Sequence, residues 1–339
     1  MLVVRLCGDV VPKSWNRWGR PLTRDSVRLW AFPLPAGMDL ANLVQALVLE
    51  TPNDLMESCL AVWINPDFDG RLPVSVLDEL EPLSVLYTRL HEPWIMGELS
   101  KLVHPGFQPV ASLEGAGRLF GYQMPCLLEH PDRGDVSVRD FHLLARQARR
   151  LEAVEQSCQI AALARRSEYL PTGVPTFIRA FPRSLLQHDP RRHPSYTCVE
   201  RLGVDPRDIV IEVADRGQVD DIDALINSCG ILRNMGFRIA LDEVGGGMGH
   251  VGLMVGLEPD FIWLDNGLIE HARQSTAGIS LLEGLVATAR GIGAATVAEG
   301  LSDAGSLRLC RELGIDFGQG PLVGPGAPVP EAPRPLPPA

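Results

Sequence analysis

An acidic stretch that ends in glycines constrains the fold of this chain most: residues 237–247 read FRIALDEVGGG. Its apolar residues predict a buried β-strand, the pair Asp242 and Glu243 lies at the carboxyl end of that strand, and Gly245–Gly247 release the backbone into a loop. In a barrel of parallel strands, side chains at such ends point into the mouth of the barrel. Carboxylate oxygens are the ligands that hard divalent cations prefer, and glycines let a phosphate approach the backbone. The stretch therefore predicts a metal-type site at one end of an α/β barrel.

Three further segments show the pattern of an apolar strand that ends in a polar residue. They are residues 209–213 (IVIEV), 297–300 (VAEG) and 316–320 (DFGQG). Together with the acidic stretch, and in this order, they resemble the motifs of EAL domains, the bacterial phosphodiesterases that open cyclic di-GMP. The resemblance covers about Leu99 to Pro328 and implies an EAL-type (β/α)8 TIM-like barrel. For members that cleave, it also implies two divalent ions that activate the attacking water.

The resemblance assigns a site residue to most strand ends, and several of these residues differ from those of the family. The matching residues are Glu212, Asp242, Asp265, Glu299 and Gln319, while Glu243 is one methylene longer than the expected aspartate. Four positions are substituted: Gln123 for a metal-binding glutamate, Leu127 for a ligand-contacting arginine, Arg179 for a metal-binding asparagine and Trp263 for a lysine. Pro125 also replaces the leucine of the motif that names the family.

These substitutions predict a weakened metal site. Gln123 keeps an oxygen but lacks the charge, and a guanidinium about 4 Å from a divalent ion, in an effective dielectric of about 20, costs about 8 kcal/mol. We therefore expect no functional catalytic residue and no resident cofactor; Mg²⁺ or Mn²⁺ would be the cofactor if the site were active. Glu212, Asp242 and Glu243 are expected to be a remnant metal site, with Glu212 and Asp242 kept as ion-pair partners of Arg179. The residues left to contact a ligand are Gln319, Glu299 and Gly245.

Three functions remain open on the sequence. The first, which we favour, is a degenerate EAL protein without phosphodiesterase activity that regulates signalling through a protein partner, in or beside cyclic di-GMP signalling. The second is a receptor that holds cyclic di-GMP without cutting it, although the loss of an arginine at Leu127 counts against phosphate contact. The third is an active phosphodiesterase with rearranged metal ligands. The resemblance also implies a homodimer formed through helices near the acidic loop.

Composition limits the partners and the compartment. The chain has 339 residues, 45% of them hydrophobic, and a formal net charge of -11. It can hold one barrel plus a small domain, and we expect a cytoplasmic protein that binds neither nucleic acid nor a membrane surface. Its start lacks the pattern of a signal peptide, and no apolar run approaches the roughly 18 residues of a membrane helix. The seven cysteines show no zinc-type spacing and predict reduced thiols.

The extent of the resemblance divides the chain into three parts. Residues 1–98 hold five of the six tryptophans and predict a small mixed α/β domain, with strands at 2–11, 27–33 and 59–64 and a helix at 40–49. Residues 73–103 are expected to form connecting helices. Residues 99–328 are the expected barrel, with helices at 137–166, 218–235, 281–292 and 301–313. Residues 329–339 are rich in proline and predict a disordered tail.

Overall fold

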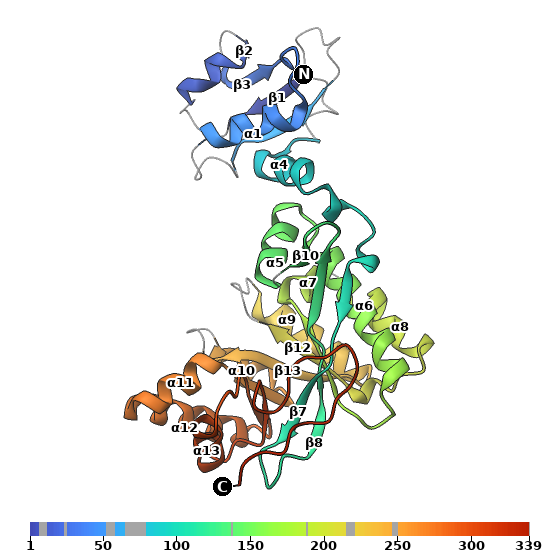
Figure 1. The fold of residues 1–339 in the computed structure, drawn as a ribbon, viewed down its shortest axis with the longest axis vertical. Coiled ribbons are helices and arrows are strands. Elements are labelled where there is room, and N and C mark those ends of the chain that lie inside the picture. The colour runs from blue at the N-terminus through green and yellow to red at the C-terminus, as the bar shows by residue number, and fades with distance from the viewer. Residues whose placement is uncertain are drawn as a thin grey trace. The chain divides into compact units, whose positions relative to one another are not determined.

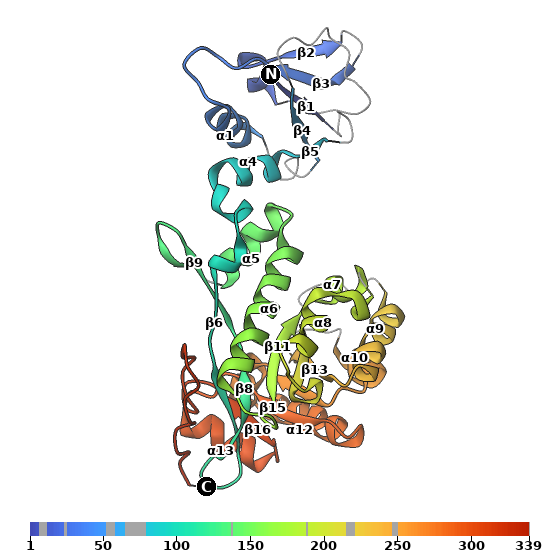
Figure 2. The same cartoon turned by 90° about the vertical axis from the view of Figure 1, so that its right-hand side faces the viewer.

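The computed structural model describes most of the chain, in two compact units. The described residues are 1–6, 12–23, 26–51, 58–64, 79–136, 138–187, 189–214, 221–245 and 250–338. The first unit comprises Met1–Leu99, His130–Asp132 and Val136–Leu151, and the second comprises Ser100–Glu129, Arg133–Asp135 and Glu152–Ala339 (Figures 1 and 2). The first unit thus contains residues beyond the predicted 1–98 segment. Within the described ranges, no helix combines the length and apolarity that crossing a membrane requires.

The first unit contains an antiparallel sheet with its main core on one face and a smaller buried cluster, which includes Val3 and Val62, on the other. The strand order is β2-β3-β1-β4-β5, with β1 Leu2–Arg5, β2 Arg20–Thr23, β3 Ser26–Phe32, β4 Leu60–Trp63 and β5 Glu81–Pro82. Because strand side chains alternate, Leu2 and Val4 face helices α1 (Leu40–Glu50) and α4 (Leu83–His91) in a core that includes Trp15 and Trp30. This confirms the predicted mixed α/β domain. Of its predicted strand at 2–11, residues 7–11 lie outside the described ranges, as do residues 73–78 of the expected connecting helices.

The second unit is a closed barrel of eight strands. Their order around the barrel is β11-β12-β13-β14-β15-β16-β7-β8. The bounds are β7 Gln108–Ser112, β8 Leu119–Gln123, β11 Thr176–Ala180, β12 Ile209–Ala214, β13 Arg238–Val244, β14 Phe261–Leu264, β15 Ala295–Ala298 and β16 Phe317–Gln319. The (β/α)8-type fold is confirmed, with one difference: β7 runs antiparallel to both β16 and β8. The short turn after Ser112 allows this, because a hairpin needs no crossover helix.

Helices surround the barrel and connect its strands (Figure 2). Their bounds are α6 Leu151–Tyr169, α7 Pro182–Gln187, α8 Pro194–Arg201, α9 Ile222–Asn234, α10 His250–Leu257, α11 Asn266–Gln274, α12 Thr276–Gly291 and α13 Ala304–Glu312. Short 3-10 turns occur at Lys13–Arg17, Pro93–Met96, Leu99–Lys101, Pro190–Arg192 and Pro206–Asp208. A separate three-stranded sheet has the order β10-β9-β6, with β6 Val103–Pro105, β9 Cys126–His130 and β10 Gly134–Val136. Residues 99–103 therefore include a 3-10 turn and the start of a strand in place of the expected helix.

The helical region predicted at 137–166 is present over the described residues, but it is divided into two helices. The structure has two helices, α5 (Val138–Gln147) and α6, and Arg149 between them adopts a φ of 54°. The backbone N–H of Arg150 donates to the carbonyl of Ala145 at 2.7 Å, which is the closing bond of a helix that ends in a left-handed residue. Glycine usually occupies such a position, so an arginine there gave no sequence signal of a helix end.

The proline-rich tail is ordered and packed, contrary to the disorder that we expected. It runs extended along the barrel, where the Leu336 N–H donates to the Ala116 carbonyl at 2.9 Å and the Tyr122 hydroxyl donates to the Glu331 carbonyl at 3.0 Å. Arg311 donates to the Pro337 carbonyl at 2.6 Å, and the Leu336 side chain is 5% exposed in the barrel core. Prolines exclude a helix or a sheet ladder, but they leave carbonyls that the barrel's own donors satisfy.

Replacing Leu336 by alanine is expected to lower the free energy of unfolding of the barrel by about 2–3 kcal/mol, because it empties a packed site. The matched control is Val329→Ala on the same tail, where the side chain is 45% exposed and the expected change is under about 0.5 kcal/mol. Urea unfolding of the full chain measures both. Equal small changes in the two variants would show that the tail does not contribute to the core.

Candidate functional site

Polar side chains from five strands converge at the carboxyl end of the parallel barrel strands. Gln123 and Gln319 are the last residues of β8 and β16, and Arg179, Glu212 and Asp242 lie near the ends of β11, β12 and β13. The strand register pairs Arg179 with Glu212 and places Asp242 beside Ala214, one pleat further along. All except Arg179 are nearly fully buried, with Glu212 1% and Asp242 0% exposed.

One side of this site is a hydrogen-bonded chain of two amides and a carboxylate. The Gln319 amide donates to Gln123 Oε1 at 3.2 Å. The Gln123 amide donates in turn to Glu212 Oε1 at 3.1 Å and to Oε2 at 3.3 Å. Both lone-pair-bearing oxygens of Glu212 are thus directed toward an N–H donor. The amide at position 123 acts here as a donor to the neighbouring carboxylate, a role that a glutamate could fill only when protonated.

The other side of the site is an ion pair between Arg179 and Asp242. Arg179 Nη2 lies 2.6 Å from Asp242 Oδ2, and the backbone N–H of Glu243 donates to Asp242 Oδ1 at 2.9 Å. Both carboxylate oxygens of Asp242 are therefore engaged. The arginine is the ion-pair partner that the sequence analysis expected for Asp242, whereas the hydrogen-bond partner of Glu212 is Gln123.

Burial and neighbouring charges raise the pKa values of three carboxyl groups of the site. Burial, and then the charge of Asp242, raise the pKa of Glu212 well above its usual value. Burial also raises the pKa of Asp242, although Arg179 opposes the shift, and burial followed by Asp242 raises the pKa of Glu299 to about 7. For Arg179, burial lowers the pKa, but Asp242 and then Glu212 outweigh it, so that its pKa is raised. The guanidinium is therefore the permanent cation of an acidic pocket.

Two residues of α6 that were not predicted from the sequence support the backbone around Arg179. Gln159 on α6 donates to the Arg179 carbonyl at 3.0 Å and to Glu155 Oε1 at 3.1 Å, and Glu155 Oε1 accepts from the Phe181 N–H at 2.8 Å. Both side chains are buried. The available signal was the spacing: two polar residues four apart fall on the apolar face of a predicted helix.

The other residues that the sequence predicted for the site lie outside the hydrogen-bonded groups described above. Asp265 is the N-cap of α11 and accepts from the Leu268 N–H at 3.2 Å. Trp263 is fully buried in the barrel interior with its ring 5.3 Å from that of Phe177, and its indole Nε1 has no hydrogen-bond partner among the described residues. Glu299 directly follows β15, and the Leu127 side chain is 50% exposed. Glu243 and Gly245, at the end of β13, have positive φ angles of 56° and 102°. Gly246 and Gly247 lie outside the described residues.

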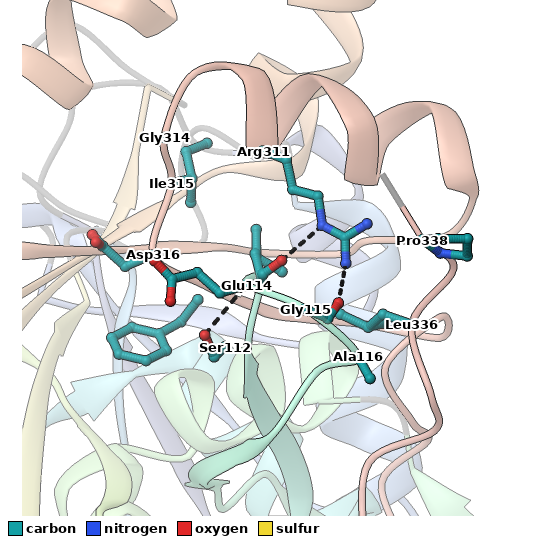
Figure 3. Close-up of a pocket in the computed structure, with 12 residues that line it drawn as sticks. Ser112, Glu114, Gly115, Ala116, Arg311, Gly314, Ile315, Asp316, Leu336 and Pro338 are labelled. Atoms are coloured by element: carbon teal, nitrogen blue, oxygen red, sulfur yellow. Dashed lines mark hydrogen bonds between the residues drawn. The ribbon is translucent and has the colours of Figure 1, made fainter.

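A cavity of about 880 Å³ lies at the opposite end of the barrel (Figure 3). Ser112, at the end of the antiparallel strand β7, and Asp316, just before β16, line it, whereas Gln319 at the far end of β16 belongs to the candidate site. Arg311 closes one wall by donating to the carbonyls of Leu113 and Gly115, each at 2.7 Å. We assign the candidate site to the acidic end, because three carboxyl groups with raised pKa values, those of Glu212, Asp242 and Glu299, gather there.

The side chains, as they are arranged, do not fit the pair of divalent ions that the resemblance to EAL domains implies. A metal needs the oxygens of Asp242 and Glu212, but Arg179 and Gln123 already occupy them. Across the described ranges, no three His, Cys, Asp or Glu side chains come together as a metal-binding group. The buried carboxylates are thus compensated by a guanidinium and by amides of the protein itself.

Comparisons with known proteins agree with this fold. The EAL domain family model matches residues 98–326. An uncharacterised protein y4lL of Sinorhizobium fredii is 22% identical over 231 residues, which is 67% of this chain but 27% of that protein, so this chain spans about a quarter of its length. The PaMucR phosphodiesterase in complex with c-di-GMP superposes with a TM-score of 0.62 at 20% identity, covering 72% of this chain and 97% of that one.

A further solved structure contains a divalent ion. The Bacillus subtilis YkuI protein, with an EAL domain and in complex with the substrate c-di-GMP and calcium, superposes with a TM-score of 0.60 at 22% identity. The superposition covers 69% of this chain and 58% of that one. The family model extends over more than half of the 339 residues, and the part that it matches contains the closed barrel. This chain therefore belongs to the EAL domain family, whose members act in cyclic di-GMP signalling.

Proposed function

We propose that this chain is an EAL-domain protein that does not hydrolyse cyclic di-GMP and that regulates signalling by binding a protein partner. The observation that carries the proposal is the 2.6 Å ion pair between Arg179 and Asp242. It places a fixed positive charge on a carboxylate that a metal would need. Releasing Asp242 to a metal would also leave the guanidinium without its closest partner in a pocket of low dielectric, which is costly.

The second support is the loss of charge at the strand end beside Glu212. Gln123 donates to both oxygens of Glu212, so the two side chains satisfy each other without an ion. A metal that lowers the pKa of its bound water needs several anionic ligands to hold it. Here one anion is replaced by an amide and another is paired with arginine.

Leu127 counts against the receptor function. Its side chain is 50% exposed at a position where the family resemblance places a phosphate-contacting arginine. A leucine offers neither a hydrogen-bond donor nor a charge to a phosphate. Of the two functions without hydrolysis, we therefore propose the protein-binding one.

Calorimetry with cyclic di-GMP, with and without Mn²⁺, tests the proposal together with a product assay. We expect no linear dinucleotide and no metal-dependent heat from the native chain. Linear dinucleotide would overturn the proposal, and binding heat without product would replace it with the receptor function.

A variant that restores the family residues provides the positive control. Gln123→Glu combined with Arg179→Asn is expected to gain Mn²⁺ binding, and a metal concentration 100 times its Kd should stabilise that variant by about 3 kcal/mol. The matched control combines Gln123→Glu with Arg191→Asn, which changes the net charge equally but alters a surface arginine paired with Asp189. Equal Mn²⁺ responses in the two variants, or in the native chain, would contradict the role given to Arg179.

A genetic test separates binding from catalysis. In a strain that lacks this gene, Glu299→Gln is expected to restore the phenotype as well as the native chain, because the proposed role does not depend on the carboxylates of the barrel mouth. Failure of an equally abundant Glu299→Gln protein would show that this carboxylate is required.

A further inference from the structure

Residues 327–338, here called the strap, lie along the outside of the barrel and are drawn in dark red in Figures 1 and 2. Half of them are prolines, which have no backbone N–H to donate. Three strap carbonyls accept hydrogen bonds from barrel side chains. The pairs are Arg165 with Pro328, the Tyr122 hydroxyl with Glu331 at 3.0 Å, and Arg311 with Pro337 at 2.6 Å. The barrel thus binds the strap through its carbonyls, the polar backbone groups that a proline-rich segment retains.

The three carbonyls are spaced by multiples of three residues. Pro328 and Glu331 are three positions apart, and Pro337 follows six positions later. A polyproline II helix has three residues per turn and no internal hydrogen bonds, so carbonyls at this spacing lie on one side of it and are open to donors. The spacing therefore indicates that the barrel binds one side of a polyproline-type helix.

The barrel surface under the first part of the strap is aromatic. The Phe107 ring lies 5.9 Å from the ring of Tyr122 and 5.7 Å from the ring of Tyr169. The Arg165 guanidinium lies 5.0 Å from the centre of the Tyr169 ring. Aromatic rings that accompany hydrogen-bond donors are the surface on which extended proline-rich segments dock in protein recognition. The residues that hold the strap are therefore of the type that binds such segments.

The strap is fixed near its two ends and exposed between them. Phe107 and Ala327 exchange two backbone hydrogen bonds, of 2.7 and 3.0 Å. At the other end the Leu336 side chain is 5% exposed, and its N–H donates to the Ala116 carbonyl at 2.9 Å. Most strap residues between these points are exposed, including Val329 at 45%. Since few contacts hold the middle of the strap, another segment that offers the same groups can take its place.

We propose that this surface is a docking site for an extended, proline-rich segment of a partner protein, and that the strap occupies it until such a segment displaces it. Counted from Pro328 as position i, the segment needs carbonyls at i, i+3 and i+9, where the strap meets its three side-chain donors. It also needs an apolar side chain at i+8, the place of Leu336. The inference rests on the proposed function, in that the chain acts by binding a protein, and it gives the chemistry of that partner.

The strap sets how tightly a partner segment must bind. Because the strap belongs to the same chain, it competes at an effective concentration on the order of 1 mM. The apparent affinity for a partner segment is the intrinsic affinity multiplied by the fraction of chains whose strap is released. Release would also open one wall of the cavity of about 880 Å³, which Leu336 and Pro338 line (Figure 3).

The experiment measures how a fluorescein-labelled peptide of the strap sequence, APVPEAPRPLPP, binds to the full chain by fluorescence anisotropy. Leu336→Ala weakens the strap of the chain while the peptide still supplies the leucine. This variant should therefore bind the peptide at least about tenfold more tightly than the native chain. Val329→Ala, at an exposed strap position, should bind it as the native chain does. A peptide that carries Leu336→Asp should bind the Leu336→Ala chain at least about tenfold more weakly than the unaltered peptide.

Two further variants, each made in the Leu336→Ala chain, test the surface that receives the peptide. Tyr122→Phe removes only the hydroxyl that donates to Glu331, and it should weaken peptide binding roughly fivefold. Tyr169→Phe removes a hydroxyl from another ring of the same aromatic group and is the matched control. It should leave the affinity unchanged, because it alters none of the three side chains that donate to the strap. Equal effects of the two variants would overturn the assignment of the peptide to this surface.

Deuterium exchange tests the native chain without any substitution. Excess peptide should speed deuterium uptake at the Leu336 N–H, because the bond from this group to the Ala116 carbonyl opens when the strap leaves. Peptide binding without faster uptake would overturn the proposal, as would a Leu336→Ala chain that binds no more tightly than the native one. A native dimer that Leu336→Asp dissociates would assign the site to the strap of a second copy and overturn the assignment to a partner.

These measurements use neither cyclic di-GMP nor a metal, so the docking site and the proposed function can fail separately. Linear dinucleotide in the product assay would overturn the proposed lack of hydrolysis and leave the peptide result unchanged. A chain that binds no peptide in any of these variants would overturn the docking site alone.

Discussion

Arg179→Leu is expected to lower the free energy of unfolding at pH 8 by about 3–5 kcal/mol, because it leaves the fully buried Asp242 without its cation. The loss should shrink as the pH falls, since an unpaired Asp242 takes up a proton more readily and escapes the cost of burial. Urea unfolding of the full chain between pH 5 and pH 8 measures the effect.

The matched control is Arg273→Leu. Arg273 lies 2.9 Å from Asp303, a comparable ion pair, but that pair is exposed on the surface and should contribute no more than about 1 kcal/mol. Adding Asp242→Asn to Arg179→Leu should recover much of the lost stability, because the unpaired carboxylate of Asp242 is then removed. If Arg179→Leu and Arg273→Leu cost the same small amount, the buried ion pair does not hold the site together.

Glu155 is expected to make the stability of the barrel fall as the pH rises. Burial is the main cause that raises its pKa from 4.5 to about 8, and the hydrogen bonds from Phe181 and Gln159 only partly oppose the shift. Below pH 4.5 the carboxyl is protonated in both the folded and the unfolded chain. Between pH 4.5 and 8 the folded chain holds a proton that the unfolded chain has lost, so the contribution of this proton to stability decreases through that range.

The measurement compares the native chain with Glu155→Gln. The free energy of unfolding of the native chain, minus that of the variant, should fall by roughly 3–5 kcal/mol from pH 4.5 to pH 8.5, at about 1.4 kcal/mol per pKa unit. Glu299 titrates in both proteins and cancels in the difference. Glu168→Gln, which alters an exposed glutamate of the same helix, is the matched control for the loss of one carboxyl group. A difference for Glu155→Gln that stays constant from pH 4.5 to pH 8.5 would mean that Glu155 is ionised when folded.

The sequence by itself determined the fold family and the positions of the site residues. The strand ends that bear Glu212, Asp242, Glu299 and Gln319 could be located because the apolar run before each one and the order of the motifs are local properties of the chain. Substitutions such as Arg179 could be read from the sequence in the same way. The residue types at these positions determine which charges are present at the barrel mouth, whatever the arrangement of the side chains.

Some local structure depended on contacts that no pattern in the sequence reports. Arg149 ends α5 in a left-handed conformation, and an arginine in a sequence does not normally indicate such a helix end. The proline tail appeared disordered by composition, yet the barrel supplies donors from Tyr122 and Arg311 and a pocket for Leu336. Composition indicates whether a segment can fold by itself. The tail is ordered because of its contacts with the barrel surface on which it lies.

The pairing within the site was decided by the tertiary structure alone. The sequence placed Arg179 near two carboxylates, but only the register of β11, β12 and β13 and the support of Gln159 direct it to Asp242 and leave Glu212 to Gln123. Hydrogen bonds and ion pairs act over a few ångströms, so the identity of each partner is fixed by packing between segments that are distant in the chain.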